Sequence, residues 1–158
     1  MAFEGYALYP PLTVKDNIAF SLMREKISKD KVDSKVMEVA ELLEITDILE
    51  RYPPSISGGQ QQRVSLARAL VRDSDALLLD EPMSQLEPQL RAVLRARVKD
   101  YIQHNNKTVI FVTHDQTEAV ALADKIAVME NGDLKQLASP YEILSLIHIS
   151  EPTRQSSI

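Results

Sequence analysis

Two acidic residues, Asp80 and Glu81, directly follow the short apolar run Ala-Leu-Leu-Leu at residues 76–79. An apolar run of this length that ends in charge predicts a buried parallel strand with carboxylates at its carboxyl end. In open α/β sheets, ligands bind outside that end of the strands. The sequence therefore places two carboxylates where a ligand would bind.

A helix start that favours anionic groups precedes this strand. Ser57 is a good N-cap residue, and Gly58 and Gly59 after it let bare backbone N–H groups approach a ligand. The free N–H groups at a helix N-terminus favour phosphate. The helix itself is predicted by apolar residues that recur on one face, namely Val64, Ala67, Leu70 and Val71.

His114 is a third residue that could take part in chemistry. It comes just after residues 108–113, a second apolar run that predicts another buried strand. A lone histidine is usually a structural or surface residue. Because His114 stands after its strand as Asp80 and Glu81 stand after theirs, we favour a functional role for it.

Helical patterns fill most of the sequence before the two glycines. Thr13 begins a capping-box-like sequence that predicts a helix to about residue 26. Apolar residues at helical spacing predict a second helix over residues 31–43. A short helix or turn is expected over residues 45–50, and the Tyr-Pro-Pro sequence at residues 52–54 breaks it.

The region after the acidic pair alternates between helix and strand patterns. Apolar residues predict a long amphipathic helix that ends at residues 104–106. Asn131-Gly132 predicts the turn of a hairpin over residues 125–137, and a further helix is expected with Pro140 at its first position.

Composition sets outer limits on the class of protein. The 158 residues, 44% hydrophobic and 26% charged, are typical of a soluble globular domain with its own core. A formal net charge of −5 argues mildly against a nucleic-acid-binding surface. The absence of cysteine excludes disulfides and thiolate metal sites. No apolar run has the length of a membrane helix, so work at a membrane would go through a partner.

The residues around the glycines and acids resemble two motifs of ATP-binding-cassette (ABC) ATPases. Residues 56–60, Ile-Ser-Gly-Gly-Gln, resemble the signature motif of that family, and residues 77–82, Leu-Leu-Leu-Asp-Glu-Pro, resemble its Walker B strand. Residues 3–10 and 113–119 are similar to the corresponding loops of importer ATPases for sugars and related solutes, of the maltose or glycerol-phosphate type. The implied fold is α/β, a partial P-loop NTPase fold with an all-helical signature subdomain.

The resemblance also implies a division of the chain. Residues 1–11 correspond to a Q-loop-like segment, residues 12–73 to the helical signature subdomain and residues 74–143 to the C-terminal half of the RecA-like core. Residues 144–158 break the resemblance, and residues 144–154 look like a translated sequencing adaptor. We expect this tail to be non-native; the alternative is a natural divergent tail.

The sequence contains no Gly-x-x-x-x-Gly-Lys-Ser/Thr, the loop that cradles nucleotide phosphates. We therefore expect a fragment that lacks the Walker A half of its parent protein and is inactive alone. Without earlier strands beside it, the strand at residues 77–79 is expected to expose a sheet edge and an apolar face.

The resemblance implies ATP and Mg²⁺ as the ligands of the parent protein. Glu81 would polarise the attacking water, Asp80 would hold Mg²⁺ through water, and His114 would contact the γ-phosphate. The signature residues would clasp the γ-phosphate of the ATP bound to a second ATPase subunit, a copy or close homologue; these are Ser57, Gly58, Gly59 and Gln60.

Two positions depart from the family pattern. Glu4 stands at the Q-loop position, where the family usually has glutamine, and Glu87 at the D-loop position, where aspartate is usual. Glutamate can still reach a metal, but it cannot donate a hydrogen bond as an amide does. Glu87 keeps the negative charge and adds one methylene.

The resemblance implies a peripheral protein at the cytoplasmic face of the cell membrane. The implied partners are a second ATPase subunit, transmembrane permease subunits and, indirectly, an extracytoplasmic solute-binding protein, with no nucleic acid. Two alternatives remain at this stage. One is a non-transport ABC ATPase of the DNA-repair or translation type, and the other is a non-catalytic half-cassette that only offers its signature face to a partner.

Overall fold

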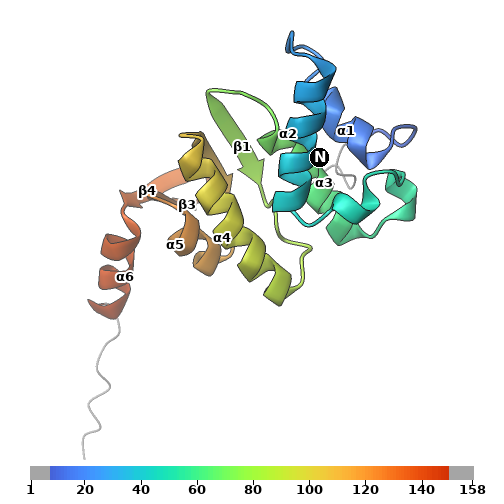
Figure 1. Ribbon diagram of the computed structural model, residues 1–158. Helices are drawn as coiled ribbons and strands as arrows, with labels where there is room; N and C mark the ends of the chain where they lie inside the picture. Colours follow the sequence, from blue (N-terminus) through green and yellow to red (C-terminus); the bar gives the residue numbers. More distant parts are fainter. Residues whose placement is uncertain (1–7, 150–158) are drawn as a thin grey trace, which may run out of the picture. The chain divides into compact units, whose positions relative to one another are not determined.

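The computed structural model describes residues 8–149 of the chain (Figure 1). The chain divides into two compact units, Met1–Val112 and Thr113–Ile158, and each is described here by itself. The predictions for Glu4 and for residues 150–158 lie outside the described residues. The functional boundaries inferred from the resemblance stay predictions.

Every regular element between residues 14 and 70 of the first unit is helical, as the sequence predicts. The helices α1 (Val14–Phe20), α2 (Lys29–Leu42) and α3 (Gly58–Leu70) pack against one another (Figure 1). The single-turn helices η1 (Thr46–Ile48) and η2 (Pro53–Ser55) connect α2 to α3. These five elements form the helical part of the unit.

The helix α1 begins where the sequence predicts but ends earlier. The Thr13 hydroxyl accepts a hydrogen bond from the Asp16 N–H at 3.1 Å, which caps the helix. The expected extension to residue 26 is wrong, because α1 ends at Phe20 and the following N–H groups bond carbonyls three residues back. These tight turns bury Leu22 and leave Met23 73% exposed.

The sheet of the first unit holds the strands β1 (Ala76–Asp80) and β2 (Thr108–Val112). They are parallel, with Ala76 opposite Thr108 and Asp80 opposite Val112. The helix α4 (Pro88–His104) connects them, as the amphipathic pattern predicts, and buries Leu94 and Val98.

One expectation about these strands is wrong. The sequence predicts buried strands, but the side chains alternate between two environments: Leu77 and Leu79 are buried while Leu78 is 74% exposed. On β2, Ile110 is exposed as well. The predicted apolar exposed face is therefore present, and only the opposite face of β1 packs into the core.

The core of the first unit is continuous from the helices to the sheet. Its most deeply buried side chains come from α1, α2, α3 and α4, from the connections between them and from β1. The largest of these side chains are Ile18, Leu22, Leu43, Ile45, Ile48, Leu70, Met83 and Leu94. Because one cluster serves all these elements, α3 and β1 are held in a fixed relation to each other.

The second unit contains the predicted hairpin. Strands β3 (Ile126–Glu130) and β4 (Asp133–Ala138) are antiparallel and joined by Asn131 and Gly132, whose φ angles are 51° and 87°. Positive φ at both central residues suits the Asn-Gly pair and the twist of the strands. The helix α5 (Gln116–Leu122) precedes the hairpin, and α6 (Pro140–Ile149) follows it with Pro140 first, as predicted.

Tyr101 on α4 makes a contribution to the stability of the first unit that is lost at alkaline pH. Its hydroxyl donates to the Leu70 carbonyl of α3 at 3.4 Å. Burial, helped by the negative charges of Glu38 and Asp73, raises the pKa of Tyr101 from 10.0 to about 12. Since the fold favours the neutral phenol, this contribution is complete below pH 10 and is lost as pH rises through about 12.

Tyr101→Phe should therefore flatten the alkaline loss of stability. The substitution keeps the ring and removes the titrating hydroxyl, so the free energy of unfolding should fall less steeply between pH 10 and about 12 than in the unsubstituted protein. Urea unfolding of both proteins across that pH range measures the two slopes. Equal slopes would show that Tyr101 does not titrate in this way.

Candidate active site

The two acids lie at the carboxyl end of the parallel sheet, as the sequence predicts. Asp80 is the last residue of β1, opposite Val112 at the end of β2, and it is exposed. Glu81 follows and is partly exposed. This edge is where α/β sheets bind ligands.

The backbone of Glu81 has an unusual conformation. Its φ angle is 47°, in the left-handed region that residues with a Cβ rarely adopt. The Glu81 N–H donates to the Val112 carbonyl at 2.9 Å. The Glu81 carbonyl accepts from the Gln62 side-chain amide at 2.9 Å and from the Ser84 hydroxyl at 3.2 Å. Hydrogen bonds on both backbone groups therefore hold a conformation that costs on the order of 1 kcal/mol.

The N-terminus of α3 is capped more fully than the sequence analysis predicts. The Ser57 hydroxyl accepts from the Gln60 N–H at 3.2 Å, which confirms Ser57 as the N-cap. The Gln60 side-chain oxygen accepts in turn from the Ser57 N–H at 2.8 Å, which completes a capping box. Between these two residues lie Gly58 and Gly59, whose N–H groups have no partner within the helix and can bind a ligand.

Close packing gives a second reason for the two glycines. A Cβ at Gly58 would lie 2.9 Å from the Gln85 side-chain oxygen, and one at Gly59 would lie 3.3 Å from the Gln85 backbone oxygen. The glycines therefore let the start of α3 approach the segment that follows the acids. The sequence predicts only a ligand-binding role for these glycines and does not reveal this contact.

Gln62 is the residue at this site that the sequence analysis missed. Its side chain is 4% exposed and bonds Glu81, Ser84 and Gln85. The available signal was helical spacing, because Gln62 lies four residues before the buried Leu66 and so on the buried face of α3.

The structure brings most of the predicted site residues of the first unit together. Gln62 and the glycine contacts connect the signature residues 57–60 to residues 81–86. Glu87 is exposed and precedes Pro88 as the N-cap of α4, without a side-chain capping bond.

His114 belongs to the second unit, on a loop fixed by its neighbours. The Asp115 N–H donates to the Thr113 hydroxyl at 3.0 Å, and that hydroxyl donates to the buried Glu118 carboxylate at 2.8 Å. Asp115 caps α5 by accepting from the N–H groups of Thr117 and Glu118. His114 itself is exposed.

The carboxylate at the end of β1 fits the way in which proteins bind Mg²⁺. Within residues 8–149, no group of three or more histidine, aspartate or glutamate side chains could hold a metal ion. A metal at Asp80 would therefore take most of its ligands from water and a bound phosphate. Mg²⁺ is bound in this way, through one or two carboxylates together with substrate phosphates.

An α/β unit with two acids at the end of one strand, beside a capped helix that starts with two glycines, is typical of phosphate-binding folds. A family model described as ABC transporter matches residues 1–84 of the chain. The chain belongs to the ABC transporter family. The predicted α/β fold of an ABC ATPase is thereby confirmed.

Similar proteins carry names of importer subunits. The trehalose/maltose import ATP-binding protein MalK of Thermococcus litoralis is 50% identical over 143 residues, which are 90% of this chain and 38% of that protein. The xylose/arabinose import ATP-binding protein XacJ of Haloferax volcanii is also 50% identical, over 90% of this chain and 37% of that protein. The sn-glycerol-3-phosphate import ATP-binding protein UgpC of Paracoccus denitrificans is 44% identical, over 90% and 40%.

A solved structure shares the fold. The ATP-binding cassette MJ0796, in a dimeric post-hydrolysis state bound to ADP and Pi, matches with a TM-score of 0.77 at 27% identity. The match covers 87% of this chain and 61% of that chain. The chain spans 37–40% of the length of the three import ATP-binding proteins named above. None of the helices within residues 8–149 is long and apolar enough to cross a membrane.

Proposed function

We propose that this chain is part of the ATP-binding and ATP-hydrolysing subunit of an importer for a sugar or a related solute. The observation that carries the proposal is the position of the two acids: Asp80 ends β1, and Glu81 after it accepts a hydrogen bond at its carbonyl from Gln62 of the glycine-started helix α3. The names of the relatives support this class of solute, because they are import ATP-binding proteins for trehalose/maltose, xylose/arabinose and sn-glycerol-3-phosphate.

The proposed chemistry assigns one task to each acidic or basic group. Glu81 polarises the water that attacks the γ-phosphate, and its bonded backbone fixes the direction from which the carboxylate reaches that water. Asp80 holds Mg²⁺ through water, and the ion neutralises charge on the phosphates. His114 contacts the γ-phosphate. Phosphoryl transfer depends mainly on such positioning and charge neutralisation, so few groups are enough.

The N-terminus of α3 is proposed to act on a different nucleotide. The N–H groups of Gly58 and Gly59, with Ser57 and Gln60 beside them, bind the γ-phosphate of the ATP held by a second ATPase subunit. Helix N-termini favour phosphate, and the exposed position of Ser57 and Gly58 leaves room for it. The dimeric state of the similar cassette MJ0796 supports a partner of this kind.

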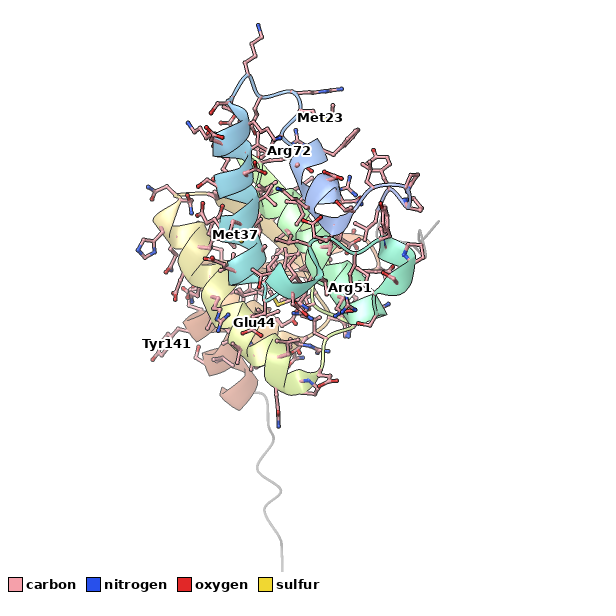
Figure 2. The ribbon with its side chains drawn as sticks, turned by 45° about the vertical axis from the view of Figure 1, so that its right-hand side comes forward. Met23, Met37, Glu44, Arg51, Arg72 and Tyr141 are labelled. Carbon is pink, nitrogen blue, oxygen red and sulfur yellow. The ribbon has the colours of Figure 1, made fainter. Side chains whose placement is uncertain are left out.

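A groove beside α1 is the proposed contact with a membrane subunit. It has a volume of about 410 Å³ and is lined by side chains that include Phe20, Met23, Ile27 and Val32. Phe20 and Met23 are 41% and 73% exposed, and Figure 2 shows Met23 beside the turn after α1. An apolar helix of a permease subunit fits such a surface. The subunit would then work at the cytoplasmic face of the membrane.

Transplanting the chain into a complete relative tests the proposed function. A chimera of the Thermococcus litoralis protein, with its matching 143 residues replaced by those of this chain, should hydrolyse ATP when Mg²⁺ is present. The measurement is phosphate release over a range of ATP concentrations. A chimera that folds and binds ATP but releases no phosphate would favour the alternative of a non-catalytic chain.

A further inference from the structure

We propose that Gln62 is a positioning residue that holds Glu81 and the signature glycines in one fixed arrangement. The proposal rests on the proposed function, because it concerns the same nucleotide site. Gln62 lies on α3, four residues after Gly58, and its side chain reaches the segment after β1. Figure 1 shows α3 next to β1, and the two elements are in contact.

The hydrogen bonds of Gln62 use both ends of its side-chain amide. The nitrogen donates to the Glu81 carbonyl at 2.9 Å and to the Ser84 hydroxyl at 3.1 Å. The oxygen accepts from the Gln85 N–H at 2.8 Å. With both donors and an acceptor engaged at 4% exposure, the side chain has one orientation, and so do the groups that it bonds.

The bond to Glu81 acts on the direction of a reacting group. Glu81 has a φ of 47°, and its N–H is bonded to Val112 of β2. Gln62 bonds the carbonyl on the other side of the same residue. Without that bond, the Glu81 carbonyl would keep only its longer bonds from Ser84, at 3.2 Å from the hydroxyl and 3.4 Å from the N–H. The backbone of Glu81 could then rotate toward a more favourable φ and carry the carboxylate with it. A displacement of about 1 Å at a reacting group can cost on the order of 100-fold in rate.

Gln85 connects this arrangement to the signature glycines. Its N–H bonds Gln62, and its backbone oxygen lies so close to Gly59 that an added Cβ would be only 3.3 Å away. A phosphate that moves the start of α3 would therefore move the residues after Glu81 as well. In the proposed function, the glycines bind the ATP held by a second subunit, while Glu81 acts on the ATP held by its own subunit. Gln62 would therefore couple the two nucleotide sites of a dimer.

Comparison with the neighbouring Gln61 separates positioning from ordinary support of the fold. The Gln61 side chain also donates two hydrogen bonds to backbone carbonyls, those of Pro53 at 2.9 Å and Ile56 at 3.3 Å. Neither carbonyl belongs to the segment that follows β1. Gln62→Met and Gln61→Met therefore remove similar bonds from the same helix, and only the first disturbs Glu81.

The test uses the full-length chimera described above and measures kcat, KM for ATP and amide hydrogen exchange at Gln85. Gln62→Met should lower kcat by about 10- to 100-fold with little change in KM. Exchange at the Gln85 N–H should become about ten-fold faster, as expected for the loss of one hydrogen bond. Gln61→Met should leave kcat and the Gln85 exchange unchanged.

Gln62→Glu provides a second variant of the same shape. It keeps the acceptor for the Gln85 N–H but loses both donors, so exchange at Gln85 should stay slow while kcat falls. Equal effects of Gln61→Met and Gln62→Met on kcat would overturn the proposal, as would unchanged Gln85 exchange in Gln62→Met. If the unsubstituted chimera is inactive, the proposed function fails, and the exchange at Gln85 still decides whether Gln62 holds this segment.

Discussion

Glu81→Gln is expected to lower the kcat of the chimera by roughly 1,000-fold, within the range that general acid–base catalysis contributes. Glutamine has nearly the same volume as glutamate, but its neutral amide cannot polarise the attacking water as a carboxylate does. ATP binding should persist, because the phosphates are bound by other groups. Single-turnover hydrolysis measures the chemical step, and equilibrium binding of ATP measures the affinity.

Glu44→Gln is the matched control for this experiment. Glu44 is another glutamate in the left-handed region, with a φ of 53°, but it lies at the end of α2 and forms an ion pair with Arg97 at 2.9 Å. Its substitution changes the charge of the chain equally and should leave kcat unchanged. If Glu81→Gln kept most of the kcat of the unsubstituted chimera, Glu81 would not be the group that acts on water.

The parts of the site that were predictable depend on short stretches of sequence. An apolar run that ends in acids identifies the end of β1, because a strand buries alternate side chains and its carboxyl end must leave the core. Ser57 before two glycines identifies the start of α3, because an N-cap bond is made within a few residues. The Asn131-Gly132 turn was predictable for the same reason. Each of these features is determined locally.

The missed parts depend on contacts between distant residues. Gln62 bonds Gln85, and no spacing within α3 reveals which segment will lie opposite its buried face. An exposed apolar face was expected for residues 77–79, but not that Leu78 forms it while Leu77 and Leu79 are buried, because an apolar run looks the same whether one face of the sheet is covered or both are. The end of α1 was misjudged because Leu22 remains buried after the α-helical hydrogen bonds have stopped.

A fully buried polar side chain near the start of α1 was also not predicted from the sequence. Asn17 on α1 is fully buried. Its side-chain oxygen accepts from the Tyr9 N–H at 2.8 Å, and its nitrogen lies within 3.1 Å of the carbonyl oxygens of Tyr9, Leu12 and Thr13. One side chain thus bonds backbone groups of three residues in the segment that enters α1, a contact that the sequence around Asn17 does not reveal.

Asn17→Ala should lower the free energy of unfolding of the first unit by about 3 kcal/mol, since each buried backbone group left without a partner costs about 1–3 kcal/mol. The loop would also lose its hold on the Tyr9 ring, which packs on Phe20 at 4.7 Å between ring centroids and lies under the Arg68 guanidinium of α3 at 5.1 Å. Urea denaturation measures the loss, and amide exchange at Tyr9 shows whether it begins in this loop.

Asn105→Ala is the control that separates a buried amide from an exposed one. Asn105 caps the end of α4, where its exposed side chain donates one bond to the Tyr101 carbonyl at 2.9 Å. Water can replace that bond, so the loss should stay within about 0.5 kcal/mol. Similar losses in the two variants would mean that water reaches the loop once Asn17 is removed. The entry to α1 would then be held by the packing of Tyr9 against Phe20 and Arg68 and not by its hydrogen bonds.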